Sequence, residues 1–165
     1  MKRMLSALFA VGTIAVLAVA VTAWANPRGD NGPHGGKGHH WGAKTITVIE
    51  HATTDATTDT GEEGDTAGDV LTFANEEFDE TDSRVVGTNQ GYCIRVVVGE
   101  SYECNWTNLL PGGSITVEGP FYDADPSVLA ITGGTGRYRK ARGEMELSAF
   151  GDDGTKFKFV FHIIR

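Results

Sequence analysis

The sequence predicts an all-β fold for residues 44–165, either a sandwich or a closed barrel. From Lys44 onward, apolar and polar side chains alternate with a period of two, which indicates strands with one face buried. Turn-forming segments rich in Gly, Pro and Asp separate most of these strands, and no segment shows a sustained helical period. Many short strands joined by tight turns are typical of both architectures.

The expected strands follow one another closely along the chain. We place them at residues 46–50, 69–74, 84–88, 92–98, 102–110, 114–118, 127–132, 142–150 and 156–164. Residues 51–69 have no periodicity and are rich in Thr, Asp, Glu and Gly, so we expect a long solvated loop there. The carboxylates of this loop lack the spacing of an EF-hand, and we expect no metal site.

The last expected strand indicates what lies inside the fold. One of its faces carries Phe157, Phe159 and Phe161, while the other is mixed. In a small barrel such a face either fills the interior or lines a ligand cavity. We take Phe159 and Phe161 as candidate ligand-binding residues, together with Trp106 and Phe121 on other expected strands.

The amino-terminal residues predict export. Lys2 and Arg3 precede an apolar run, and Ala23 and Ala25 have the small-residue spacing that signal peptidases accept. We therefore expect residues 1–25 to be a signal peptide cleaved after Ala25, the alternative being an uncleaved anchor. Cleavage would remove two positive charges and take the formal charge from −8 to −10, which disfavours nucleic acid as a partner.

Residues 26–43 are rich in Gly and His and poor in apolar side chains, so we expect a flexible, disordered arm. Its histidines, His34, His39 and His40, could bind a transition metal loosely. They lack cysteine or carboxylate partners at ligand spacing, which favours a solvated tail.

Cys93 and Cys104 are the two cysteines of the chain. If strands 92–98 and 102–110 form a hairpin with its turn near Gly99, residues whose numbers sum to 197 face each other, and Cys93 then faces Cys104. An exported protein keeps such a pair oxidised, so we expect a disulfide. The alternative is that Cys93 is a free thiol facing a cavity.

Three segments resemble the allene oxide cyclase family: Gly87–Cys93 (GTNQGYC), Ile115–Phe121 (ITVEGPF) and Leu129–Gly136 (LAITGGTG). Residues 133–143, with Gln90-Gly91-Tyr92, are similar to the plant dirigent proteins, which share that fold. The resemblance covers roughly residue 44 to the end. It implies an eight-stranded antiparallel closed barrel of the calycin type, usually trimeric, with an apolar cavity.

The resemblance also implies a function. Allene oxide cyclases close a strained epoxide into a ring, and dirigent proteins hold radicals, made by a separate oxidase, while they couple. We therefore expect a barrel that binds a small apolar molecule without a cofactor and steers its cyclisation or stereoselective coupling. A non-catalytic carrier for an apolar metabolite is the alternative, and a homotrimer and a separate oxidase are the expected protein partners.

Several candidate site residues come from matching the family patterns. Glu50 falls where the cyclase has a carboxylate on its first strand, and the period of two places Glu50 with Ile46 and Val48. A strand-end glutamate pointing to solvent is the alternative. Cys93 matches the cavity cysteine, and Phe121 stands where the cyclase has a tyrosine, so both a disulfide at Cys93 and the missing hydroxyl argue against the plant cyclase reaction.

Two arginines complete the expected catalytic set. Arg142 matches an arginine of the dirigent GGTG block, and a guanidinium there could hold a phenolate. Arg95 shares a strand face with Cys93, so we expect it to be a polar group inside the cavity that stabilises Glu50 if the two lie close together.

Overall fold

The computed structural model describes residues 43–164. The expected signal peptide at 1–25 and nearly all of the expected arm at 26–43 lie outside these residues. No helix within residues 43–164 is long and apolar enough to cross a membrane.

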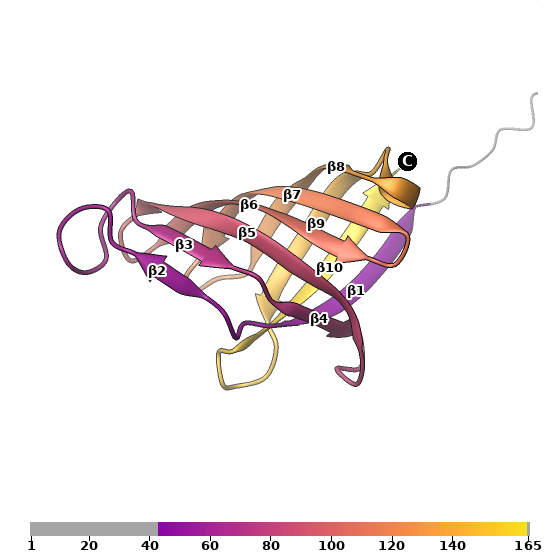
Figure 1. Cartoon of the computed structure of the whole chain (residues 1–165), viewed down its shortest axis with the longest axis horizontal. Helices are drawn as coiled ribbons and strands as arrows, with labels where there is room; N and C mark the ends of the chain where they lie inside the picture. The colour runs from indigo at the N-terminus through magenta and orange to yellow at the C-terminus, as the bar shows by residue number, and fades with distance from the viewer. Residues whose placement is uncertain (1–42, 165) are drawn as a thin grey trace, which may run out of the picture. The chain divides into compact units, whose positions relative to one another are not determined.

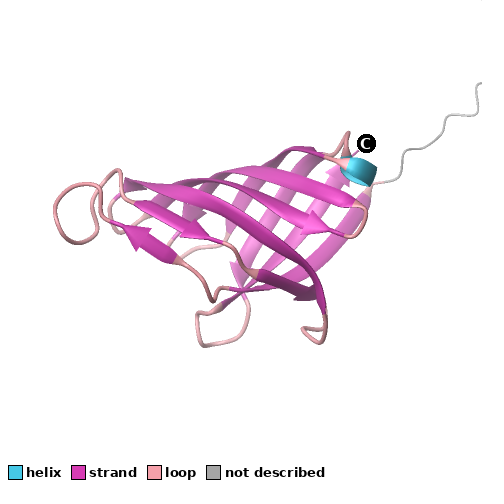
Figure 2. Ribbon diagram, in the orientation of Figure 1, coloured by secondary structure: helices cyan, strands magenta, loops and turns pink. Residues whose placement is uncertain are grey.

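The described part of the chain is almost entirely β-structure (Figure 2). One short 3-10 turn, η1 (Gly136–Tyr138), follows the GGTG segment. The strands are β1 (Lys44–His51), β2 (Ala56–Thr58), β3 (Val70–Phe73), β4 (Glu76–Asp79), β5 (Val85–Val97), β6 (Ser101–Leu110), β7 (Gly113–Tyr122), β8 (Ser127–Gly134), β9 (Arg142–Ala149) and β10 (Lys156–Ile164).

The strands close into an eight-stranded antiparallel barrel, which confirms the expected fold class (Figure 1). Around the ring the order is β5-β4-β1-β10-β9-β8-β7-β6, and the pairing of β6 with β5 closes it. Strand β3 continues the line of β4 along β5, and the short β2 pairs with the outer edge of β3. Closure leaves the backbone donors and acceptors of the ring paired on both sides.

Three local expectations were wrong. Residues 84–88 and 92–98 are parts of one 13-residue strand, β5, rather than two strands. Gly91, between the two expected strands, lies opposite Trp106, and a Cβ there would approach the Trp106 Cβ to 2.2 Å, so glycine is needed for close packing. Strand β4 was missed, and the expected loop at 51–69 contains β2, which forms because the edge of β3 is free to pair.

The apolar face of β10 both fills the barrel and lines a cavity. Phe161 and Ile163 are fully buried at the closed end of the barrel, with Met145 and Ile115 in the same core. Phe157 and Phe159 lie nearer the start of β10, where the interior is not filled. The apolar face of β10 therefore fills the interior in one half of the barrel and lines a cavity in the other.

The expected cysteine hairpin is confirmed. Cys93 pairs with Cys104 and Arg95 with Tyr102 across β5 and β6, and the two sulfur atoms form a disulfide. The free-thiol alternative for Cys93 is therefore wrong. A buried disulfide of this kind is consistent with an extracytoplasmic location.

We predict that the disulfide stabilises the barrel modestly, because it closes a short loop with a sequence separation of 11 residues. The double variant Cys93→Ala/Cys104→Ala should lose about 2–3 kcal/mol of unfolding free energy relative to the oxidised protein. Urea denaturation followed by circular dichroism measures this difference. Equal unfolding free energies for the variant and the oxidised protein would show that the disulfide does not stabilise the paired strands β5 and β6.

Candidate functional site

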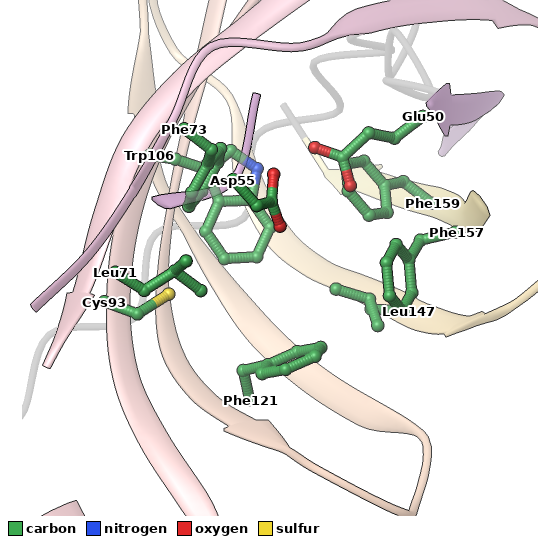
Figure 3. A pocket seen from close by; sticks show the side chains of 10 residues that line it. All are labelled: Glu50, Asp55, Leu71, Phe73, Cys93, Trp106, Phe121, Leu147, Phe157 and Phe159. Atoms are coloured by element: carbon green, nitrogen blue, oxygen red, sulfur yellow. The ribbon is translucent and has the colours of Figure 1, made fainter. Parts of the chain in front are cut away.

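A cavity occupies the end of the barrel at which β1 finishes and β10 begins (Figure 3). The space open to the centre of a water molecule is about 60 Å³. Its wall is mostly apolar and aromatic, and its only ionisable side chains are carboxylates. The lining residues are Glu50, Asp55, Leu71, Phe73, Cys93, Trp106, Phe121, Leu147, Phe157 and Phe159.

Glu50 is the buried polar group of this cavity. The pleat of β1 turns its side chain inward, and only 6% of the residue is exposed, so the solvent-facing alternative is wrong. One oxygen, Oε1, accepts hydrogen bonds from Asn89 Nδ2 at 2.6 Å and Asn75 Nδ2 at 3.1 Å. Burial raises the pKa of Glu50, although the two amide hydrogen bonds oppose that shift; the nearby Asp55 charge adds to it.

Asn75 connects Glu50 to the loop at the cavity mouth. It lies at the break between β3 and β4 and is 1% exposed. Besides its bond to Glu50, Nδ2 donates to Asp55 Oδ1 at 2.7 Å. The amide oxygen accepts from the backbone N–H groups of Thr53 and Thr54 and from the Thr54 hydroxyl, each at 3.0 Å. A single amide therefore fixes both carboxylates of the cavity and the loop that carries Asp55.

Glu77 is a second interior carboxyl, directly behind Glu50. The two residues are cross-strand partners on β4 and β1, and Glu77 is fully buried. Neither of its carboxyl oxygens has a hydrogen-bond partner among the described residues. Burial, and secondarily the charge of Glu50, raise the pKa of Glu77 to about 8, so it holds its proton at neutral pH.

The two arginines expected in the catalytic set lie elsewhere. Arg95 is buried but does not line the cavity; its guanidinium pairs with Asp65 at 2.6 Å and Asp123 at 2.8 Å rather than with Glu50. It also stacks on the ring of Tyr102, with 3.6 Å between the guanidinium carbon and the ring centroid. Arg95 therefore ties the 51–69 segment and the β7–β8 turn to β5.

Arg142 is exposed at the start of β9, and its Nη1 donates to the Ala141 carbonyl oxygen. It does not line the cavity either.

Most of the expected ligand-binding residues do meet at the cavity. Trp106, Phe121 and Phe159 line it, with Trp106 and Phe159 ring centroids 5.7 Å apart. Trp106 Nε1 donates to Asn108 Oδ1, which leaves the indole face toward the cavity side chains. The sulfur-bearing side chain of Cys93 also contributes to the wall, while Phe161 packs in the core beyond it.

Sequence reasoning missed three buried polar residues, Asn75, Glu77 and Asn89, and the place of the exposed Asp55 at the cavity. Asn75, Glu76 and Glu77 form a polar run that is typical of a loop. The signal that could have revealed Asn75 and Glu77 is alternation, because both share the parity of the apolar Leu71 and Phe73. Within residues 43–164, no cluster of His, Cys, Asp and Glu is placed to hold a metal.

The described residues thus form a closed barrel with an aromatic cavity and a buried carboxyl group. A family model described as "Allene oxide cyclase barrel like domain" matches residues 46–160. The chain therefore belongs to the allene oxide cyclase barrel-like family, which confirms the resemblance seen in its motifs.

Several solved structures share the fold. A pyocyanin demethylase is 27% identical with a TM-score of 0.61, covering 70% of this chain and 98% of its own. The pterocarpan synthase dirigent protein PsPTS1 is 21% identical with a TM-score of 0.60, over 73% and 96% of the two chains. The Diels-Alderase AbnU is 12% identical with a TM-score of 0.57, over 74% and 98%. The latter two similarities concern the fold alone.

We predict that Glu77 makes the barrel less stable as pH rises. The pKa of Glu77 is about 8 in the folded protein and 4.5 ordinarily, so the folded state binds this proton more tightly than the unfolded state does. The contribution to the unfolding free energy is fully present below pH 4.5 and is lost as the pH rises toward 8. Relative to Glu77→Gln, the native protein should lose roughly 1.4 kcal/mol per pH unit over this window.

Urea denaturation at several pH values between 5 and 8 measures the effect. The exposed neighbour Glu76 provides the matched control, and Glu76→Gln should follow the native pH profile. If the native protein and Glu77→Gln instead run parallel across this range, Glu77 is not a buried neutral acid.

Proposed function

We propose that the barrel encloses a small, largely apolar aromatic molecule in its cavity and steers a rearrangement or coupling of that molecule. The observation that carries this proposal is Glu50, a buried carboxyl group set among the rings of Trp106, Phe157 and Phe159 and held by two amides. A carboxyl group costs free energy in such a wall, and function is a good reason for a fold to keep one there.

The geometry suggests how the steering works. Rings on β6, β7 and β10 surround the ligand and restrict it to few conformations, which lowers the entropic part of the barrier. Glu50 then supplies the buried polar group: as a carboxylic acid it donates a proton, and as a carboxylate it accepts one or orients a hydroxyl. Its raised pKa brings both forms nearer to neutral pH.

The names of the similar structures support a small-molecule role, since they include a demethylase, a pterocarpan synthase and a Diels-Alderase. A carrier without chemistry is the second candidate. It is favoured by the placement of Arg95 and Arg142 away from the cavity and by the disulfide at Cys93, which together leave Glu50 as the sole buried polar group of the wall. A carrier would release its ligand chemically unchanged.

We further propose that the protein is exported and that residues 1–25 are removed. The basic start, apolar run and Ala23/Ala25 spacing support this proposal, as does the disulfide.

We predict that filling the cavity abolishes ligand binding without unfolding the barrel. Leu71 is half-buried in the cavity wall, so Leu71→Trp should occupy the space and tolerate the larger side chain. Fluorescence titration should show saturable one-to-one binding of 2-naphthol to the native protein, weakened roughly tenfold or more in the variant, a loss above 1.4 kcal/mol. Val128→Trp, on the exposed face of β8, should bind normally. A failure of 2-naphthol to bind the native protein would contradict the cavity proposal.

We predict that the exported protein begins at Asn26. Intact-mass measurement of protein recovered outside the cytoplasm should give a chain lacking residues 1–25 and two hydrogens lighter than its reduced form, because the disulfide is closed. Recovery of a chain that still begins at Met1 would instead support the anchor alternative.

A further inference from the structure

We propose that the cavity selects an aromatic cation, meaning a ring system that carries a positively charged nitrogen, over neutral and anionic molecules of the same shape. This inference deepens the proposed function and rests on it. With Glu50 ionised, the cavity wall combines carboxylates with aromatic rings that meet edge-on or tilted, and its side chains offer no free hydrogen-bond donor. Figure 3 shows the carboxyl groups of Glu50 and Asp55 pointing into the space between the rings.

The one side-chain donor of the cavity wall and both hydrogens of the Asn75 amide are already used. Trp106 carries the one N–H group among the lining side chains, and this group donates to Asn108 at 3.2 Å. Asn75 Nδ2 donates one bond to Glu50 and one to Asp55, which uses both of its hydrogens. A ligand that brings a carboxylate or another anion would find no partner here, and its desolvation would go uncompensated.

The acceptors are not used up. Both amide bonds to Glu50 end on Oε1, and the bond from Asn75 to Asp55 ends on Oδ1. Among the described residues, no hydrogen bond reaches Glu50 Oε2 or Asp55 Oδ2. Asn75 draws the two carboxylates together, and the charge of Asp55 raises the pKa of Glu50. A cation placed between them would relieve this repulsion and satisfy the remaining oxygens.

The aromatic wall favours the same ligand. Phe73, Trp106, Phe121, Phe157 and Phe159 present ring faces or edges to the cavity, and the quadrupole of a ring face attracts a positive charge. Arg95, the buried cation among residues 43–164, does not compete, because it is already paired with Asp65 and Asp123. The formal charge of −8 adds a field that attracts cations from solution.

Three probes of nearly equal size separate charge from shape: N-methylquinolinium (cation), 1-naphthalenemethanol (neutral) and 1-naphthoate (anion). Calorimetric titration of the full exported protein should rank them in that order, with the cation roughly tenfold or more tighter than the neutral probe. Glu50→Gln should weaken the cation about tenfold and leave the neutral probe within about threefold. Glu118→Gln, which removes a charge from the outer face of β7, should change neither.

Each outcome decides between the two proposals. If the neutral probe binds as tightly as the cation, or if Glu50→Gln weakens both equally, the cation inference is wrong while the cavity proposal stands. If no probe binds, the proposed function itself fails. The thermal stability of Glu50→Gln, measured alongside, separates lost affinity from lost folding. Equal weakening of the cation by Glu118→Gln would show that the overall field, not the cavity carboxylates, attracts it.

Discussion

The amide of Asn75 is the interaction on which the site depends. Its oxygen gathers the backbone of Thr53 and Thr54, and its nitrogen holds Glu50 and Asp55. Removing this amide would take one of the two hydrogen bonds from the buried Glu50, leaving it the bond from Asn89, and would release the backbone N–H groups of Thr53 and Thr54 from their shared acceptor. The loop after β1, the mouth of the cavity and the buried carboxyl group are therefore a single hydrogen-bonded unit, positioned by one side chain at the break between β3 and β4.

The same break explains why two acids sit inside an apolar barrel. The short strand β4 pairs with β1, so its inward residue Glu77 is brought directly opposite Glu50. One acid is hydrogen-bonded and faces the cavity, whereas the other has no partner and keeps its proton. Two neighbouring carboxyl groups with such different surroundings differ in pKa. The charge of Glu50 helps to keep Glu77 protonated, while the amides of Asn89 and Asn75 favour the charged form of Glu50 and oppose the pKa increase that burial causes.

The fold was predictable from the sequence because its strands carry local signals. Alternation and turn residues identified most strands, and the register sum placed Cys93 opposite Cys104 without reference to distant parts of the chain. The inward position of Glu50 also followed from parity. The features that could not be predicted depend on long-range pairing. The sequence of β4 is polar and typical of a loop, and it forms a strand because it pairs with β1 on one side and β5 on the other. Arg95 was expected inside the cavity beside Glu50, and this was wrong because its partners, Asp65 and Asp123, come from segments without periodicity.

The barrel can hold a hollow, acidic end because its other end is solid. Beyond the cavity, Phe161, Ile163, Met145 and Ile115 fill the interior with no exposed area, and burial of this kind supplies most of the favourable free energy of a small domain. Strands β1, β6 and β10 each run from the packed half into the half that contains the cavity. The packed half therefore holds in place the strands that form the cavity wall. The disulfide lies in the hollow half, where packing contributes least. The unpaired carboxyl of Glu77 can therefore be tolerated, because the packed half of the barrel provides the stability that this carboxyl removes.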